Sequence, residues 1–278
     1  MRTISSDEII ATVRDLVKAA GTDLEPDILD ALVQARDEEV SPLARHVLEL
    51  FIANADIASR EKIPTCQDTG VAVLFVEIGQ EVYVEGSLED AIQEGVKQGY
   101  QDGFLRMSVC DPITRINTGT NTPAVIHYEM AAGDKIRVFM LPKGCGSENM
   151  SGLTMLPPSA GIGGMVDFVV QTVVDAGPNP CPPLLVGVGM GGSFEKAALL
   201  AKKSLQRPLG QAHGRQDIAQ LEEEIKAKVN EQGMGVQGLG GNHTALAVHI
   251  ESFPSHIASL PVAVNIQCHA HRYKTITI

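Results

Sequence analysis

The segment PTCQDTG, residues 64–70, places a thiol, an amide and a carboxylate side by side between a proline and a glycine. A neighbouring carboxylate disfavours the thiolate, so the combination of Cys66 and Asp68 is a poor design for a cysteine nucleophile. The arrangement suits a sulfur that is bound to a metal, with Gln67 and Asp68 facing whatever else that metal binds. Taken alone, Asp68 could also begin an Asx-turn.

The chain contains an odd number of widely spaced cysteines, which argues against a disulfide framework and favours reduced thiols. Two of them share features with Cys66. Cys181 is flanked by prolines, which fix the backbone of a loop, and Cys268 ends the apolar run PVAVNIQC. The five cysteines are Cys66, Cys110, Cys145, Cys181 and Cys268.

Three thiolates separated by 115 and 87 residues can only be gathered by the whole fold. An iron–sulfur cube that is held by three thiolates leaves one iron without a protein ligand, open to oxygen ligands. Spacing does not prove such a site, and buried structural thiols remain the commoner role for cysteines of this kind.

Two further motifs suggest other ligands but lack the supporting context. GVGMGG, residues 187–192, matches the dinucleotide pattern G-x-G-x-x-G, but no acidic residue ends a second strand about 20 residues later. We therefore interpret it as a tight strand-to-helix turn. CHAHR, residues 268–272, is too compact for the usual zinc spacing. A Cys–His nucleophile pair has no local signature in this chain.

Residues 1–62 read as helices, with a capping box from Ser5 to Glu8 and Pro42 at a first helical position. Beyond them, alternating β-rich and helical patterns predict an α/β fold with mixed sheets and packed helices. Residues 124–131 and 135–141 read as a hairpin. The predicted helices cover 87–103, 163–177, 193–206 and 215–233, and the predicted strands cover 71–79, 183–192, 245–252, 261–268 and 273–278.

Length and composition limit the possible domain organisation, partners and localisation. The 278 residues are 44% hydrophobic, which is enough for a substantial core, and we expect a single domain over residues 1–278, with a helical segment (1–62) and a cluster-binding α/β core (63–278). The net charge is −12 and the basic residues are scattered, so nucleic acid and anionic lipid are not expected partners. Without a signal peptide or a long apolar run, we expect a cytoplasmic protein.

Several long motifs occur in one order along nearly the whole chain, and together they resemble the α chain of the two-subunit class I fumarate hydratase and L-tartrate dehydratase family of iron–sulfur hydro-lyases. These motifs are CQDTG, INTGTNTPA, NPCPPLLVGVGMGGSFEKAALLAKK, GVQGLGGNHTALAVHIE and CHAHR. The resemblance implies a [4Fe–4S] cluster whose ligands match Cys66, Cys181 and Cys268.

The resemblance also implies the remaining site residues. Asp68 would be the acid that protonates a departing hydroxyl, and Gln67 would bind a substrate carboxylate. Arg106 matches a substrate-binding arginine, and His256 matches a histidine of the active site. Gly144 and Cys145 lie in LPKGCGSEN, a loop that covers the substrate in related enzymes, and Cys145 is the main rival for the third cluster ligand.

The implied reaction is the reversible hydration of a dicarboxylic alkene, fumarate, to L-malate. In single-chain relatives, the base that removes the C–H proton belongs to a second module that follows this region. We therefore expect a separate β subunit to complete the site, in an assembly of the α2β2 type. The alternatives are an L-tartrate dehydratase or mesaconase α subunit, an electron carrier whose cube has a fourth thiolate, and a structural zinc module.

Overall fold

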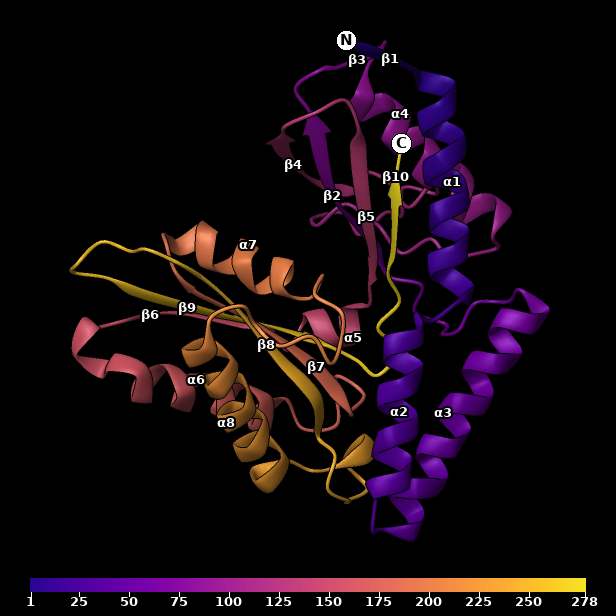
Figure 1. Ribbon diagram of the computed structural model, residues 1–278. Helices are drawn as coiled ribbons and strands as arrows, with labels where there is room; N and C mark the ends of the chain where they lie inside the picture. Colours follow the sequence, from indigo (N-terminus) through magenta and orange to yellow (C-terminus); the bar gives the residue numbers. More distant parts are fainter. The chain divides into compact units, whose positions relative to one another are not determined.

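The computed structural model describes residues 1–278, and the chain divides into two compact units (Figure 1). Each unit is assembled from separate stretches of the chain. The predicted helical segment 1–62 contributes to both units and does not form a part of its own, and the expectation of a single domain stays a prediction. Unit 1 comprises Met1–Glu25, Asn54–Cys145 and Arg272–Ile278, and unit 2 comprises Pro26–Ala53 and Gly146–His271.

The main sheet of unit 1 has the strand order β10-β5-β2-β4. Strand β2 (Val71–Gly79) pairs with β5 (Ile136–Lys143) in antiparallel fashion and with β4 (Val125–Ala131) in parallel fashion. The predicted hairpin of residues 124–131 and 135–141 is therefore wrong, because β2 lies between its two strands. Most of β2 is buried, which suits a central strand, whereas β4 contains only exposed and half-buried residues and forms an edge. Strand β10 (Lys274–Thr277) pairs with β5.

Helices α1 (Ser6–Thr22) and α4 (Leu88–Asp102) bury their apolar faces in the core of unit 1. The Ser5 side chain caps α1 by accepting a hydrogen bond from the backbone N–H of Glu8, which confirms that part of the predicted capping box. Two short parallel strands, β1 (Arg2–Ser5) and β3 (Val82–Glu85), were not predicted. Their four-residue length gives too little periodicity to detect.

The sheet of unit 2 has the order β6-β9-β7-β8, with β7 buried throughout and parallel to β8. Strand β9 is antiparallel to both β6 and β7. The predicted strands over 183–192, 245–252 and 261–268 are thereby confirmed, and β6 is an addition. The strands are β6 (Gly152–Leu156), β7 (Leu184–Gly191), β8 (Ala245–Phe253) and β9 (Leu260–Gln267).

Helix α7 covers one face of this sheet, and α6 and α8 cover the other (Figure 1). A Cβ atom at Gly187 or Gly189 would collide with backbone oxygens of α7, so these two glycines let the helix lie directly on β7. Packing therefore accounts for these two glycines of the GVGMGG motif. The predicted helices are confirmed as α6 (Gly161–Ala176), α7 (Phe194–Ser204) and α8 (Gln216–Gln232).

The buried carboxylate of Glu39 ties the remaining helices of unit 2 to the loop before β8. It accepts hydrogen bonds from the backbone N–H of Asn242 at 2.9 Å and lies 3.0 Å from Nδ1 of His243. Glu39 lies between α2 (Pro26–Glu38) and α3 (Pro42–Glu61), and α3 contributes to both units. Short helical turns form α5 (Cys145–Glu148), η1 (Pro158–Ala160) and η2 (Val236–Gly238).

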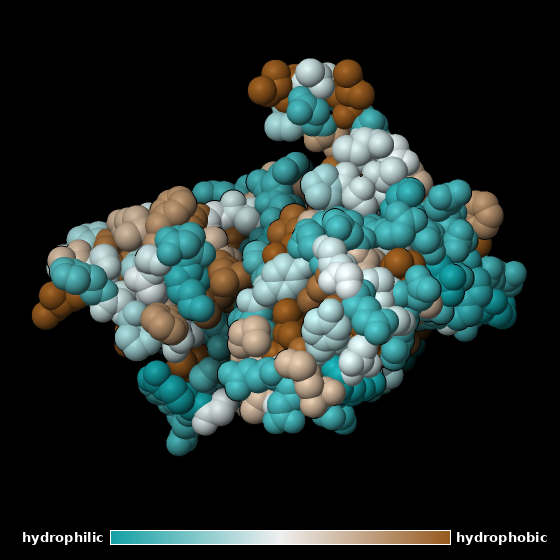
Figure 2. All heavy atoms as spheres, turned by 90° about the horizontal axis from the view of Figure 1, so that it is seen from above, coloured by the Kyte–Doolittle hydropathy of each residue, from teal (hydrophilic) through white to brown (hydrophobic).

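Hydrophilic and hydrophobic residues are mixed over the face that Figure 2 presents. Every helix is too short or too polar to cross a membrane.

Candidate active site

The CQDTG turn of unit 1 holds the Asp68 carboxylate through both of its oxygens. Oδ1 accepts the backbone N–H of Gly70 at 3.1 Å, and Oδ2 accepts the backbone N–H of Cys145 at 2.8 Å. Asp68 therefore does form an Asx-turn, as the residues alone allowed, and the same carboxylate also reaches a loop 77 residues away. Each oxygen keeps a second lone pair for a ligand or a proton.

Gly70 explains why this approach is possible. Its φ of +78° is in the left-handed region, and a Cβ atom there would lie 2.8 Å from the backbone N and C atoms of Lys143. Only glycine lets the end of β5 pass this close to the turn. As a result, Gly144 and Cys145 lie beside Asp68, and the structure brings together three residues that we predicted for the site.

Buried side chains also hold the carbonyl oxygens of the turn. Arg272 Nη2 donates to the carbonyl oxygen of Asp68 at 2.7 Å, and the Tyr100 hydroxyl lies 3.0 Å and 2.9 Å from those of Thr69 and Gly70. Burial raises the pKa of Tyr100 well above its usual range, so its hydroxyl remains a neutral donor.

Asn121 completes this set of contacts. Its Nδ2 donates to the carbonyl oxygen of Gly70 at 3.1 Å, and its Oδ1 accepts the backbone N–H groups of Ser108 and Val109. Sequence reasoning missed both Asn121 and Tyr100. The INTGTNTPA motif could have pointed to Asn121, but nothing in the helical pattern around Tyr100 distinguishes it from an ordinary core residue.

Arg106 and Gln67 present exposed side chains on the same unit. The carbonyl oxygen of Arg106 accepts the Thr69 hydroxyl at 2.6 Å, which fixes the backbone of Arg106 against the turn. Gln67 Oε1 lies 3.5 Å from Cys66 Sγ. The exposed guanidinium of Arg106 can form a bidentate contact with a carboxylate ligand.

In unit 2, Cys181 and Cys268 lie near the same end of two neighbouring inner strands, because Cys181 precedes β7 and Cys268 follows the antiparallel β9. His269 connects them: its backbone N–H donates to the carbonyl oxygen of Cys181 at 3.4 Å, and its Nδ1 lies 3.1 Å from the same oxygen. The φ of Cys181 is +60°, a conformation that costs an L-residue roughly 1–2 kcal/mol. Strain of this kind at a cysteine motivates a functional hypothesis.

The structure does not bring His256 to this end of the strands. His256 is exposed in the turn between β8 and β9, where its Nδ1 accepts the backbone N–H of Ala258 at 3.1 Å. The eight residues of β9 separate it from Cys268, a span of about 26 Å at the usual rise of a strand. Within one chain, His256 and Cys268 therefore lie at opposite ends of the same strand.

The chemistry of the thiols fits an iron–sulfur cluster. None of the five cysteines forms a disulfide, and Cys66, Cys181 and Cys268 are each partly or fully exposed. Cys66 belongs to unit 1, and Cys181 and Cys268 belong to unit 2. No group of three or more histidine, cysteine, aspartate or glutamate side chains forms a ready-made metal site.

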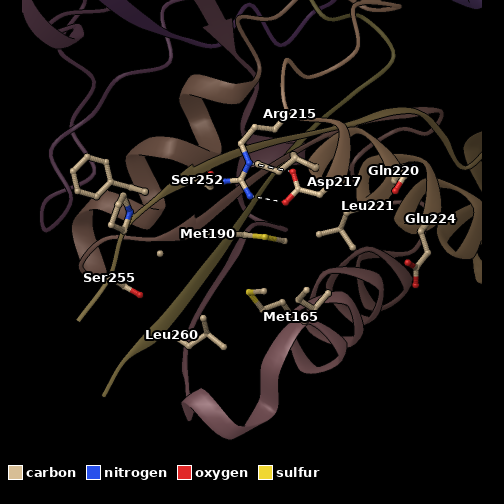
Figure 3. A pocket seen from close by; sticks show the side chains of 15 residues that line it. Met165, Met190, Arg215, Asp217, Gln220, Leu221, Glu224, Ser252, Ser255 and Leu260 are labelled. Atoms are coloured by element: carbon tan, nitrogen blue, oxygen red, sulfur yellow. Dashed lines mark hydrogen bonds and ion pairs between the residues drawn. The ribbon is translucent and has the colours of Figure 1, made fainter. Parts of the chain in front are cut away.

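A cavity of about 500 Å³ lies elsewhere in unit 2, between α6, α8 and the turn between β8 and β9 (Figure 3). Met165, Met190 and Leu221 point into it, and Arg215 at its margin is paired with Asp217. A mainly apolar cavity whose arginine is already paired does not suit a dicarboxylate, and none of the predicted site residues lines it.

The structure combines a turn that holds a carboxylate in place with partly exposed cysteine thiols, on an α/β scaffold. Comparison with known proteins identifies a family that matches nearly the whole chain. The family described as Fumarate hydratase (Fumerase) matches residues 10–277.

Curated relatives extend the match over nearly the whole chain. A Methanocaldococcus jannaschii protein, provisionally named L(+)-tartrate dehydratase subunit alpha, is 42% identical over 272 residues, covering 95% of each chain. The L(+)-tartrate dehydratase subunits alpha of Escherichia coli and Shigella sonnei are 34% identical over 277 residues, covering 98% of this chain and 90% of theirs. The chain therefore belongs to the fumarate hydratase and tartrate dehydratase family of hydro-lyases.

Proposed function

We propose that this chain is the α subunit of a [4Fe–4S] hydro-lyase that, with a β subunit, reversibly hydrates fumarate to L-malate. One observation carries the proposal: the carboxylate of Asp68, two residues from Cys66, is held by the backbone N–H groups of Gly70 and Cys145. A carboxylate with both oxygens oriented and a lone pair left on each is suited to proton transfer at a fixed point.

Cys66, Cys181 and Cys268 would hold the cluster as thiolates. When bound, a cube with three protein ligands supplies an open iron that acts as a Lewis acid toward oxygen ligands. Cys145 remains the rival third ligand. The hydrogen bond from its backbone N–H to Asp68 gives it a role in the site that does not need its sulfur.

The chain's own residues bind the substrate and transfer one proton. Arg106 offers a bidentate contact for one carboxylate of the dianion, and the amide of Gln67 can donate to a carboxylate oxygen. In dehydration, protonated Asp68 gives its proton to the oxygen of the departing hydroxyl, and in hydration its carboxylate takes a proton from the incoming water. Gly144 and Cys145 close the other side of Asp68. His256, at the far end of β9, is left out of the site that we assign to one chain.

The second half of the chemistry requires a base for the C–H proton, which we assign to a partner chain. The names of the relatives support this division, because each is called a subunit alpha. We propose a β subunit that carries the base and further cationic groups for the substrate, in an α2β2 assembly. The isolated α chain should then show little turnover.

A specific observation favours a second candidate, L-tartrate dehydratase, because the relatives that are 34% and 42% identical to this chain carry that name. Both reactions remove or add water at a four-carbon dicarboxylate. L(+)-tartrate carries a hydroxyl on both middle carbons, whereas L-malate carries only one. A site that hydrogen-bonds the additional hydroxyl can discriminate strongly against a substrate that lacks it. Residues of the loop around Gly144 and Cys145 are our candidates for this choice on the α side.

The direct test is to co-express the chain with its β subunit, reconstitute the complex anaerobically with iron and sulfide, and measure turnover of fumarate, L-malate, L(+)-tartrate and mesaconate. We expect one of the first three to be turned over at least a hundredfold faster by the complex than by α alone. Full activity of the α chain alone would refute the proposed division between subunits. A well-folded, reconstituted complex that turns over none of these acids would refute the hydro-lyase assignment.

A further inference from the structure

Arg272 is the largest fully buried side chain of the protein, with 1% of its surface exposed. Its guanidinium makes a single hydrogen bond, from Nη2 to the carbonyl oxygen of Asp68, and its Nε and Nη1 have no partner. Burying a charge without a paired carboxylate and with unfilled donors is costly. A gain in folding stability therefore does not explain why an arginine occupies this position.

The one hydrogen bond of Arg272 is to the peptide group that follows Asp68 in the turn. The carbonyl oxygens of Asp68, Thr69 and Gly70 each accept a buried side-chain donor. Tyr100 and Asn121 hold the second and third oxygens, and both donors are neutral. Arg272 alone holds the carbonyl oxygen of Asp68, and it alone brings a positive charge.

We propose that Arg272 is a positioning residue that orients the Asp68 carboxylate by holding the Asp68–Thr69 peptide group. The peptide orientation fixes where the side chain of Asp68 leaves the backbone. It therefore decides whether Oδ1 and Oδ2 meet the N–H groups of Gly70 and Cys145. The catalytic meaning of this role rests on the proposed function, because there Asp68 transfers the proton.

The first arm of the test uses the metal-free full chain and measures hydrogen exchange of individual backbone amides. In Arg272→Met, we expect the amides of Gly70 and Cys145 to exchange about tenfold faster, because the acceptor on Asp68 loses its orientation. The Asx-turn of Asp111 is a matched control in the same unit, since Asp111 Oδ1 accepts the N–H groups of Ile113 and Thr114. Exchange at Ile113 and Thr114, and the melting temperature, should stay unchanged.

Arg272→Lys is the second variant, which keeps the positive charge but loses the planar fork. We expect an intermediate rise in exchange at Gly70 and Cys145. If the exchange of these two amides is unchanged in Arg272→Met, the inference is wrong. It is equally wrong if both variants unfold or raise exchange throughout unit 1, because Arg272 is then an ordinary structural residue.

The second arm measures kinetics of the reconstituted αβ complex. Arg272→Met should lower kcat roughly 10- to 100-fold, as removal of an outer supporting contact does, with KM nearly unchanged. If KM rises together with the fall in kcat, Arg272 affects substrate binding, and this would contradict positioning through Asp68. If the wild-type complex is inactive but the exchange result holds, the proposed function fails while the positioning of Asp68 stands.

Discussion

Unit 1 contains the fully buried Arg272 and unit 2 the partly buried Arg207, and the two arginines differ in what they bind. In unit 2, Arg207 is paired with the buried carboxylate of Glu222, which also accepts the backbone N–H of Ile250 at 2.7 Å. In unit 1, Arg272 donates to the backbone carbonyl oxygen of Asp68 and has no ion pair. Both leave Nε and Nη1 without a partner, so the partner group is the informative difference.

The two arginines differ in whether a carboxylate balances their charge. The pair of Arg207 and Glu222 compensates its own charge and ties α8 to β8, which is what a structural contact needs. The charged side chain of Arg272 instead donates a hydrogen bond to a turn that also contains Cys66 and the oriented carboxylate of Asp68. If this distinction is right, changes at the two arginines should affect different measured quantities.

The largest effect is expected at the carboxylate that Arg272 supports. Asp68→Asn can still form the Asx-turn but cannot transfer a proton, so kcat of the αβ complex should fall by roughly 10²–10⁴-fold. Asp111→Asn, in the exposed Asx-turn of the same unit, is the control and should leave kcat unchanged. Comparable losses in both variants would mean that turn geometry, and not proton transfer, limits the reaction.

The next effect concerns stability and distinguishes the two arginines directly. Arg207→Met leaves Glu222 buried and unpaired, so the free energy of unfolding should fall by about 3–5 kcal/mol. Adding Glu222→Gln should restore much of it, because the amide keeps an acceptor for Ile250. Arg272→Met should leave the free energy of unfolding nearly unchanged. Denaturant titration of the metal-free chains measures these free energies, and equal losses in both variants would show that the two arginines have the same structural role.

The free energy of unfolding should also depend on pH through His249, which lies near Arg207. Burial, with the nearby charge of Arg207, lowers the pKa of His249 from 6.5 to about 3. The unfolded chain binds this proton near pH 6.5 and the folded chain does not. The stability from a neutral His249 is therefore present above pH 6.5 and is lost as the pH falls toward 3, by about 1.4 kcal/mol per pH unit.

His249→Gln removes this contribution, and the difference in unfolding free energy between wild type and variant should narrow as the pH falls from 6.5 to 4. Urea titrations at several pH values measure it. A difference that does not change with pH would mean that His249 is protonated in the folded state as readily as in the unfolded state.

The smallest effect is expected at the neutral donor of the turn. Tyr100→Phe removes the hydroxyl that holds the carbonyl oxygens of Thr69 and Gly70, and should lower the free energy of unfolding by about 1–2 kcal/mol. Because Arg272 still holds Asp68, kcat should fall much less than in Arg272→Met. A kcat loss as large as that of Arg272→Met would show that the whole turn, and not one peptide group, sets the carboxylate.

Local patterns predicted most of the elements. The sequence predicted the cap at Ser5, Pro42 at the first position of α3, the apolar period of α6 and α8 and the unbroken apolar run of β7, because each depends on neighbours in sequence. The order of strands was not visible. A Gly-Asp connection favours a hairpin, but burial of β2 on both faces placed it between β4 and β5.

The site was predicted unevenly for the same reason. Asp68, Gly144 and Cys145 were identified from their motifs, and the structure brings them together. Tyr100 escaped, because its contact with the turn depends on how α4 packs. The separation of His256 from Cys268 follows from the length of β9, which motif matching does not measure. The assignment of the cysteines as cluster ligands stays a prediction.

EPR of the anaerobically reconstituted, reduced αβ complex tests whether three thiols hold a cluster whose open iron binds a dicarboxylate, as we propose. We predict a [4Fe–4S] signal that L-malate or L(+)-tartrate perturbs, that survives Cys145→Ser and that is lost in Cys66→Ser, Cys181→Ser and Cys268→Ser. A signal that no dicarboxylate perturbs, or that requires Cys145, would contradict the account and indicate a four-thiolate electron carrier.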